Sequence, residues 1–237
     1  MITNILSYSP IYTDSLVILV FLSLWINYYL YSRRAAKKID SLSSAMRAHR
    51  VSSINNVMGL DTKTTGAIIL ANVDRNVSFF ASTALLLLAS LMSLLTKVSV
   101  IQQVINDLPY AYTLNSTQVY IRLLLLISIF VYAYFTLTWS LRQSSFASLM
   151  IGAGINSGTE SAKTYVKLTA KLMDISAHSA NQGLRAYYFS LAALTWFYHP
   201  LVFLSACIVV LLILYRREFN SATAGILIEA KNNLPKV

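Results

Sequence analysis

The sequence predicts an all-α integral membrane protein, a helical bundle of four transmembrane helices with two amphipathic surface helices. Its four apolar stretches contain no acidic residue and end at or near Lys or Arg; they are 16–31, 77–95, 123–141 and 186–215. About 20 apolar residues cross a bilayer, where a helix satisfies its own backbone. Of the 237 residues, 56% are hydrophobic and only 12% are charged, which excludes an ordinary soluble domain.

Four spans and their loops use nearly the whole length, so we expect a single membrane domain, 1–237. The expected elements are spans at about 13–32, 77–96, 121–141 and 194–215, inner loops 33–75 and 142–186, and a C-terminal tail 218–237. The segment before span one has no cationic region and no small-residue cleavage site. We therefore expect span one to be retained and not removed as a signal peptide.

Basic residues follow span one directly, at Arg33, Arg34, Lys37 and Lys38. Such clusters face the cytoplasm, so we expect the N-terminus outside and the protein in a bacterial inner membrane. These cations should contact anionic lipid headgroups. The next apolar residues recur at helical spacing and predict a helix along the inner surface; they are Ala35, Ile39, Leu42 and Met46.

Span two carries small residues in pairs four apart, at Ser78, Ser82, Ala89 and Ser93. Small side chains allow close approach of another helix, so this face is expected to pack against one. The short outer loop that follows has a helical apolar stripe ended by Pro109, which predicts a short interfacial helix.

Span three begins with Arg122 and closes with Trp139 and Arg142. We expect the long Arg122 side chain to extend to the outer interface, away from the hydrocarbon.

The second inner loop contains an amphipathic helix with a lysine stripe, at Lys163, Lys167 and Lys171. A stripe of this kind is typical of a face toward solvent or headgroups, so this helix is expected to lie on the inner surface without spanning.

The last apolar run, 186–215, would be about 45 Å long as one helix, against a hydrocarbon core of about 30 Å. Pro200 predicts a kink, with the span proper in the second part and Ala186–Thr195 dipping into the inner interface. Four spans would leave the C-terminus outside, with Arg216 and Arg217 against the charge bias. If the run instead bends at Pro200 as a re-entrant hairpin, the tail lies inside.

Five ordered strings resemble the multi-pass membrane family known as domain-of-unknown-function family 599, found in bacteria and plants. They are Phe79 to Thr83, Trp139 to Gln143, Gly183 to Phe189, Trp196 with His199 and Pro200, and Arg216 to Phe219. The resemblance extends from about span one to Phe219. It implies a helical membrane fold and no established activity, so it supplies no catalytic residue.

The candidate functional residues flank or divide the last apolar run: Arg185, His199, Pro200, Arg216, Arg217 and Glu218. Ionisable groups within membranes are often functional, although a neutral His199 that caps the Pro200 kink is the simpler interpretation. The simplest role of Arg185, Arg216, Arg217 and Glu218 is to anchor the run. A sharper hypothesis is that Glu218 pairs with an arginine of a neighbouring helix, which matters only at a site that excludes water.

No catalytic, cofactor-binding or metal-binding residues are predicted, because the sequence has no nucleophile elbow, phosphate loop or metal-spaced cluster. We expect a non-enzymatic structural or interaction component that oligomerises or packs in a larger membrane complex, with lipids and no nucleic acid as partners. The alternative is a small channel or transporter with a pore between protomers near His199 and Pro200. The acid-free apolar stretches count against ion coupling in that alternative.

Overall fold

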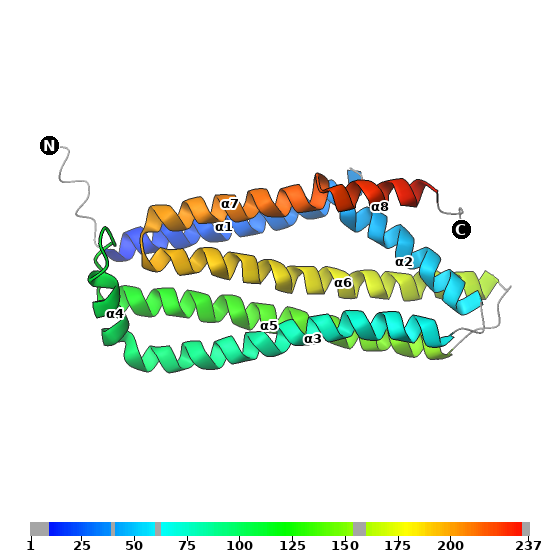
Figure 1. The fold of residues 1–237 in the computed structure, drawn as a ribbon, viewed down its shortest axis with the longest axis horizontal. Helices are drawn as coiled ribbons and strands as arrows, with labels where there is room; N and C mark the ends of the chain where they lie inside the picture. Colours follow the sequence, from blue (N-terminus) through cyan, green and yellow to red (C-terminus); the bar gives the residue numbers. More distant parts are fainter. Residues whose placement is uncertain (1–9, 39–40, 60–62, 154–159, 234–237) are drawn as a thin grey trace.

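The computed structural model describes residues 10–38, 41–59, 63–153 and 160–233, and all regular secondary structure there is helical. In chain order the elements are α1 (Pro10–Lys38), α2 (Leu42–Gly59), α3 (Lys63–Leu94), η1 (Leu95–Lys97), α4 (Val98–Asn106), α5 (Ser116–Ala153), α6 (Glu160–Leu194), η2 (Thr195–Phe197), α7 (Pro200–Phe219) and α8 (Ala222–Asn232). They form an elongated bundle (Figure 1). The predicted all-α fold is confirmed.

Four stretches of the described residues are long and apolar enough to cross a membrane: Thr13–Ser32, Asn72–Asn106, Ser116–Ala153 and Pro200–Asn232. The first coincides with the first predicted span, and the next two contain the second and third. The fourth begins at Pro200 and not near residue 194, because the chain turns immediately before this proline. The protein is therefore a multi-pass membrane protein.

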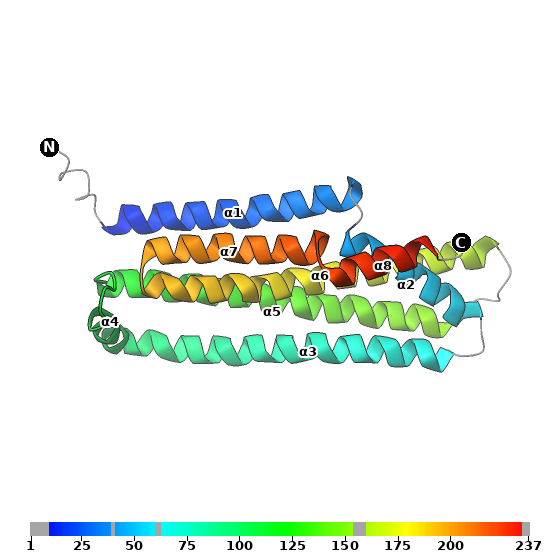
Figure 2. The ribbon, with the colours of Figure 1, turned by 45° about the horizontal axis from the view of Figure 1, so that its top comes forward.

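The long helices run nearly parallel to one another between two distinct ends of the bundle. Figures 1 and 2 show α4 and the start of α1 at one end, with α2, α8 and the C-terminal end of the described chain at the other. The helices α3, α5 and α6 lie in sequence across the bundle, and α7 follows α6 (Figure 1). Within this arrangement α3 is the edge helix and packs chiefly along α5.

The closest helix pair is α5 and α6, which pack along much of their length. Gly183 of α6 allows this approach, because a Cβ atom there would lie only 2.5 Å from Leu137 Cγ of α5. Ser140 and Ser176 exchange buried hydrogen bonds across the interface: each hydroxyl donates to the other residue's carbonyl oxygen, at 2.8 and 2.9 Å. Small residues and interhelical hydrogen bonds are the usual means of helix association in lipid.

Helix α1 packs on the bundle through large aromatic side chains. The ring of Phe21 is fully buried, with its centroid 5.8 Å from that of Phe189 and 5.3 Å from that of Phe203. Trp25 stacks on Phe189 at 4.8 Å. These contacts join α1 to α6 and α7, so aromatic rings fill the interface along the middle of α1.

The overlong apolar run forms two antiparallel helices, not one kinked span. Its first part completes α6, and Ala186, Phe189 and Trp196 are buried there at 0% exposure. After the turn at η2, α7 runs back toward α2 (Figure 1). The expectation that Ala186–Thr195 dips into the inner interface is therefore wrong, since this segment reaches the α4 end, where the Tyr112 amide donates to the Tyr198 carbonyl at 2.9 Å.

The C-terminal helix α8 packs against α2, so the C-terminus returns to the end of the bundle that holds the first loop. His49 Nε2 of α2 lies 3.1 Å from the carbonyl oxygen of Leu227 of α8. The arrangement with the C-terminus opposite this loop is wrong. The chain does turn just before Pro200, as in the alternative, but the hairpin consists of the long helices α6 and α7 and is not re-entrant. Arg216 and Arg217 thus lie at the same end as the other basic segments.

The smaller helices agree in part with expectation. The short helix expected in the outer loop is present as α4, and a helix follows span one as α2. However, α2 packs on α6 and α8, and the lysine-striped helix is the first half of α6, which runs along α5 within the bundle. Ile39 and the residues 154–159 before α6 lie outside the described residues.

Candidate functional site

A buried ion pair joins α1 to α5 at the α4 end of the bundle. The Arg122 guanidinium lies with one nitrogen 3.4 Å from Asp14 Oδ1, and its other terminal nitrogen donates to the Trp196 carbonyl oxygen. The Arg122 guanidinium carbon also lies 4.9 Å from the centroid of the Trp196 ring. The two charged side chains are 0% and 1% exposed, so the pair is removed from solvent.

This pair corrects two expectations. Arg122 does not extend to the interface, because its side chain turns inward between α1 and η2. The first helix also carries a buried carboxylate, Asp14, two residues before the acid-free stretch begins. The sequence does contain an indication of this pair, because Asp14 and Arg122 have opposite charges and stand at the outer ends of the first and third apolar stretches. Removing one partner of a buried pair typically costs about 3 to 5 kcal/mol.

A second ion pair joins α6 to α7 toward the opposite end. Arg185 Nη2 lies 3.9 Å from Glu218 Oε2, with side chains 12% and 11% exposed. The other carboxylate oxygen of Glu218 accepts hydrogen bonds from the Ser43 hydroxyl at 2.5 Å and the Ser43 amide at 3.2 Å. The prediction that Glu218 pairs with an arginine of a neighbouring helix is confirmed.

Arg185 extends this cluster to α1. It donates to the Ser32 hydroxyl at 3.1 Å, and its guanidinium lies 5.3 Å from the centroid of the Tyr28 ring. Together with Glu218 and Ser43, these contacts tie α1, α2, α6 and α7 at one point. A charged group that links four helices in this way fixes their relative positions.

The neighbouring arginines of α7 differ in their surroundings. Arg217 donates to the hydroxyl of Tyr188 and lies 5.5 Å from the centroid of its ring. Arg216 is exposed. Both lie at the end of the helix where cations interact favourably with the carbonyl groups of the last turn, so an anchoring role accounts for them.

His199 and Pro200 form the turn between η2 and α7. His199 is the N-cap of α7, and its Nδ1 accepts a hydrogen bond from the Leu201 amide at 3.1 Å. Pro200 occupies the first helical position, where a missing N–H costs nothing. The ring of Tyr112 meets His199 edge to face at 6.0 Å. This geometry favours the capping interpretation of His199.

The small residues of span two do not face the rest of the chain. Ser78, Ser82, Ala89 and Ser93 are all exposed, whereas α3 packs on α5 through its opposite side. The buried residues on that side are Val77, Ala81, Ala84 and Leu91. The small-residue face is thus open for a contact outside the chain, and its packing role remains a prediction.

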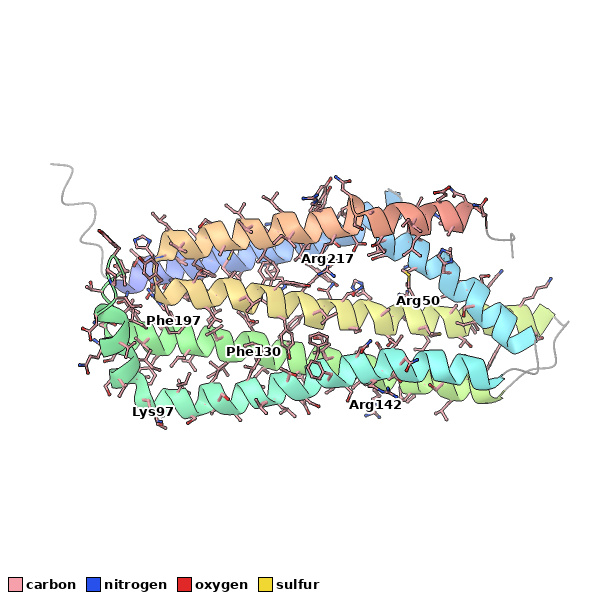
Figure 3. The ribbon with its side chains drawn as sticks, in the orientation of Figure 1. Arg50, Lys97, Phe130, Arg142, Phe197 and Arg217 are labelled. Atoms are coloured by element: carbon pink, nitrogen blue, oxygen red, sulfur yellow. The ribbon has the colours of Figure 1, made fainter. Side chains whose placement is uncertain are left out.

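The basic residues expected at headgroups lie toward the α2 end. Lys163, Lys167 and Lys171 are exposed, as is Arg34. The side chains of Arg33, Lys37 and Lys38 lie outside the described residues. Figure 3 shows Arg50 and Arg142 in the half of the bundle away from α4, Arg217 near its middle where α7 ends, and Lys97 beside α4.

The first loop helix is held to α6 by a network of charges. Arg47 and Arg50 of α2 lie 2.6 and 2.8 Å from the two carboxylate oxygens of Asp174. Burial lowers the pKa of the Arg50 guanidinium, and the nearby Asp174 carboxylate opposes that shift. Arginine stays protonated in proteins, so this remains a charge-assisted contact.

Metal-binding groups do not gather in the described part of the chain: no three His, Cys, Asp or Glu residues lie close enough there to hold an ion. Cys207 is buried within α7.

The fold and these contacts define a multi-pass helical membrane protein whose buried charges join helices. A family model described as "Protein of unknown function, DUF599" matches residues 16–223, so the chain belongs to this family. The resemblance noted from the five sequence strings is thereby confirmed. Searches of curated protein sequences and of solved structures gave no match.

Proposed function

We propose that this protein is a non-enzymatic interaction component of a bacterial inner membrane, which packs against a second copy of itself within a larger membrane complex. The observation that carries this proposal is the edge position of α3 together with its open face of small residues. Helices in lipid associate by close packing and interhelical hydrogen bonds, both of which small and hydroxylated side chains favour.

The open face of α3 has the composition of a helix contact. Ser82 and Ala89 are exposed near its middle, with large apolar residues on either side, such as Phe79 at 66% and Leu86 at 68% exposure. Large apolar residues pack against lipid tails as favourably as against another protein helix, so they do not identify an interface. The small residues do, because they allow a second helix to approach closely. A two-fold axis beside α3 would bring the same positions of two copies together.

The polar groups of the candidate residues support a structural role. Glu218 accepts from Ser43 and faces Arg185, and His199 caps α7. Glu218 is held between Arg185 and both the amide and the hydroxyl of Ser43, and the His199 Nδ1 atom is occupied by the Leu201 amide, so both groups are engaged in structural contacts. This is the basis for proposing that the protein has no enzymatic activity.

The charge distribution supports an orientation with the α4 end outside and the α2 end in the cytoplasm. Of the Lys and Arg residues in the described ranges, only Lys97 and Arg122 lie toward the α4 end, and Arg122 is paired with Asp14. In this orientation α6 is a fifth crossing of the bilayer, shielded from lipid on much of its surface by α5 and α7. The exposed lysines of α6 and Arg216 would then meet cytoplasmic solvent or anionic headgroups.

Self-association can be tested by measuring the mass of the protein in detergent and in lipid nanodiscs. We expect the wild-type protein to be a dimer or larger, and the S82I/A89I variant to be a monomer because branched side chains prevent close approach. The matched control is L86I, at an exposed apolar position of the same helix. A monomeric wild-type protein in both media would contradict the proposal.

A small channel or transporter is the second candidate, favoured by one observation. Asp14 supplies the buried carboxylate that the acid-free apolar stretches lacked, and its partner Arg122 contacts η2, directly before His199 and Pro200. Ionisable residues inside membranes commonly mark substrate pathways. Solute flux into liposomes that is lost in R122Q or H199A would support this candidate, and absence of flux would contradict it.

A further inference from the structure

The buried cluster around Arg122 contains more hydrogen-bond donors than acceptors. Four of the six buried polar side-chain atoms without a partner in the described residues belong to this cluster or its neighbouring turn. Three are N–H donors and one is an acceptor: Arg122 Nε, Gln118 Nε2, Trp196 Nε1 and Asp14 Oδ2. A buried donor without an acceptor typically costs about 1 to 3 kcal/mol, so the cluster lacks acceptor oxygens.

The orientation of Gln118 is fixed by its own contacts. At the start of α5, its side-chain oxygen accepts from the Asn115 amide at 3.1 Å, and the Asn115 side chain accepts from the Gln118 amide at 2.9 Å. The Gln118 side chain is 2% exposed and lies one helical turn before Arg122 on the same face. Its NH₂ group is therefore a buried donor beside the guanidinium.

Asp14 neutralises Arg122 without filling its hydrogen-bonding capacity. The single contact between them, at 3.4 Å, is longer than the 2.7 to 2.9 Å typical of a charge-assisted bond. A carboxylate that binds an arginine well does so with both oxygens, yet Asp14 Oδ2 has no partner. The pair thus combines a complete charge balance with an incomplete set of hydrogen bonds.

We propose that Arg122 is a binding site for a small carboxylate anion, in which Asp14 acts as an internal counter-ion that an external carboxylate displaces. The incoming anion supplies the acceptor oxygens that Arg122 Nε and its neighbours lack and compensates the charge of Arg122, and the displaced Asp14 carries its own charge out of the buried site. Trp196 forms one wall of the site, because its ring lies under the guanidinium. This inference is independent of self-association through α3.

The position of the cluster allows an anion to arrive from the α4 end. Asp14 lies in the second turn of α1, and Arg122 in the second turn of α5. The connection before α5 passes over them, with Tyr110 93% exposed and Tyr112 bonded to the η2 turn. Asp14 and Arg122 lie on different helices, α1 and α5, and the contact between them is separate from the packing of α5 on α6.

Chemical rescue tests this site directly. The D14A variant removes the internal carboxylate and leaves space for an external one, so its unfolding temperature should fall and rise again with added acetate. Sodium chloride at the same ionic strength controls for general salt effects. E218A is the matched control, since it removes a carboxylate from the other arginine pair, where Ser32 and Tyr28 also contact Arg185.

A second measurement follows binding in the protein that retains Asp14, so its comparison with R122Q does not depend on the folding of D14A. In a W25F/W139F background Trp196 is the only tryptophan, and its fluorescence should change saturably with acetate. We expect D14A to bind acetate at least ten times more tightly than the protein with Asp14, and R122Q to show no saturable change.

Three results would overturn the proposal. They are an equal response to acetate and chloride, an acetate response that persists in R122Q, and a response to phosphatidylglycerol in nanodiscs without one to acetate. The last result would identify the site as a contact for lipid headgroups and not for a soluble carboxylate.

Discussion

Asp14 and Ser32 lie on the same helix and contact two arginines of other helices, Asp14 the buried guanidinium of Arg122 and Ser32 the partly buried guanidinium of Arg185. Their separation along α1 is about five turns, or roughly 27 Å at 1.5 Å per residue. A bilayer has a hydrocarbon core of about 30 Å. The separation of the two ion pairs along α1 thus matches the thickness of this core, and the aromatic contacts of Phe21 and Trp25 lie between them.

The Arg185 and Glu218 pair should show energetic coupling. R185Q and E218Q each leave a partly buried charge without its partner, whereas the double variant R185Q/E218Q removes both charges. We expect the double variant to lose less stability than the sum of the single variants, by about 0.5 to 3 kcal/mol. Unfolding of the four proteins in detergent measures this coupling, and strictly additive losses would refute it.

Gly183 should be intolerant of even the smallest side chain. In G183A the new Cβ would lie 2.5 Å from Leu137 Cγ, so the buried Leu137 side chain or the α5 backbone must shift. Overpacking of this kind costs about 1 to 3 kcal/mol and lowers the unfolding temperature. The control is G225A on α8, where nothing lies within 4 Å of the added atom. Equal unfolding temperatures for the two variants would argue against close α5 and α6 packing.

The termini should lie on opposite sides of the membrane. Five passes of the chain between the two ends of the bundle, by α1, α3, α5, α6 and α7, place the described C-terminal helix opposite the start of α1. A green fluorescent protein fused after the tail should fluoresce in the cytoplasm, and a cysteine placed before α1 should react with an impermeant reagent from outside. Both reporters on one side would refute this topology.

Asp174 should hold α2 to α6. In D174N the two arginine contacts lose their charge partner, so we expect faster amide hydrogen exchange throughout α2 while α5 is unchanged. The matched control is the exposed lysine variant K171Q on the same helix. Exchange in α2 that is the same in D174N and wild-type protein would show that apolar contacts alone fix this helix.

Local patterns in the sequence predicted much of the fold. Acid-free stretches of sufficient length located the spans, because lipid exposure demands apolar side chains around most of a helix. A break of the last apolar run at Pro200 was predictable because proline lacks a backbone donor, and the arginine partner of Glu218 was predictable from charge. The predicted kink was wrong, because the chain reverses fully there between α6 and α7, and that reversal depends on packing between helices.

The course of α6 was the main error, and its cause is physical. This helix is covered by α5 and α7 on much of its surface, so it keeps polar residues such as Ser176 and Ser190, whose hydroxyls donate to the carbonyl oxygens of Ser140 and Tyr187. Its average composition therefore lacks the signature of a lipid-exposed span. The Asp14 and Arg122 pair was not predictable from the sequence for a related reason. Each residue lies at the end of an apolar stretch, where a charged side chain usually contacts the membrane interface, and only the packing of α1 near α5 and η2 brings the two together.

Disulfide cross-linking in native membranes tests the proposed self-association most directly. In a C207A background, S82C and A89C should each form a dimer on mild oxidation, whereas L212C on α7 and L19C on α1, both 62% exposed, should remain monomeric. Cross-linking confined to α3 is the result we expect. Failure of S82C and A89C to cross-link, or equal cross-linking at all four positions, would contradict a specific interface on the open face of α3.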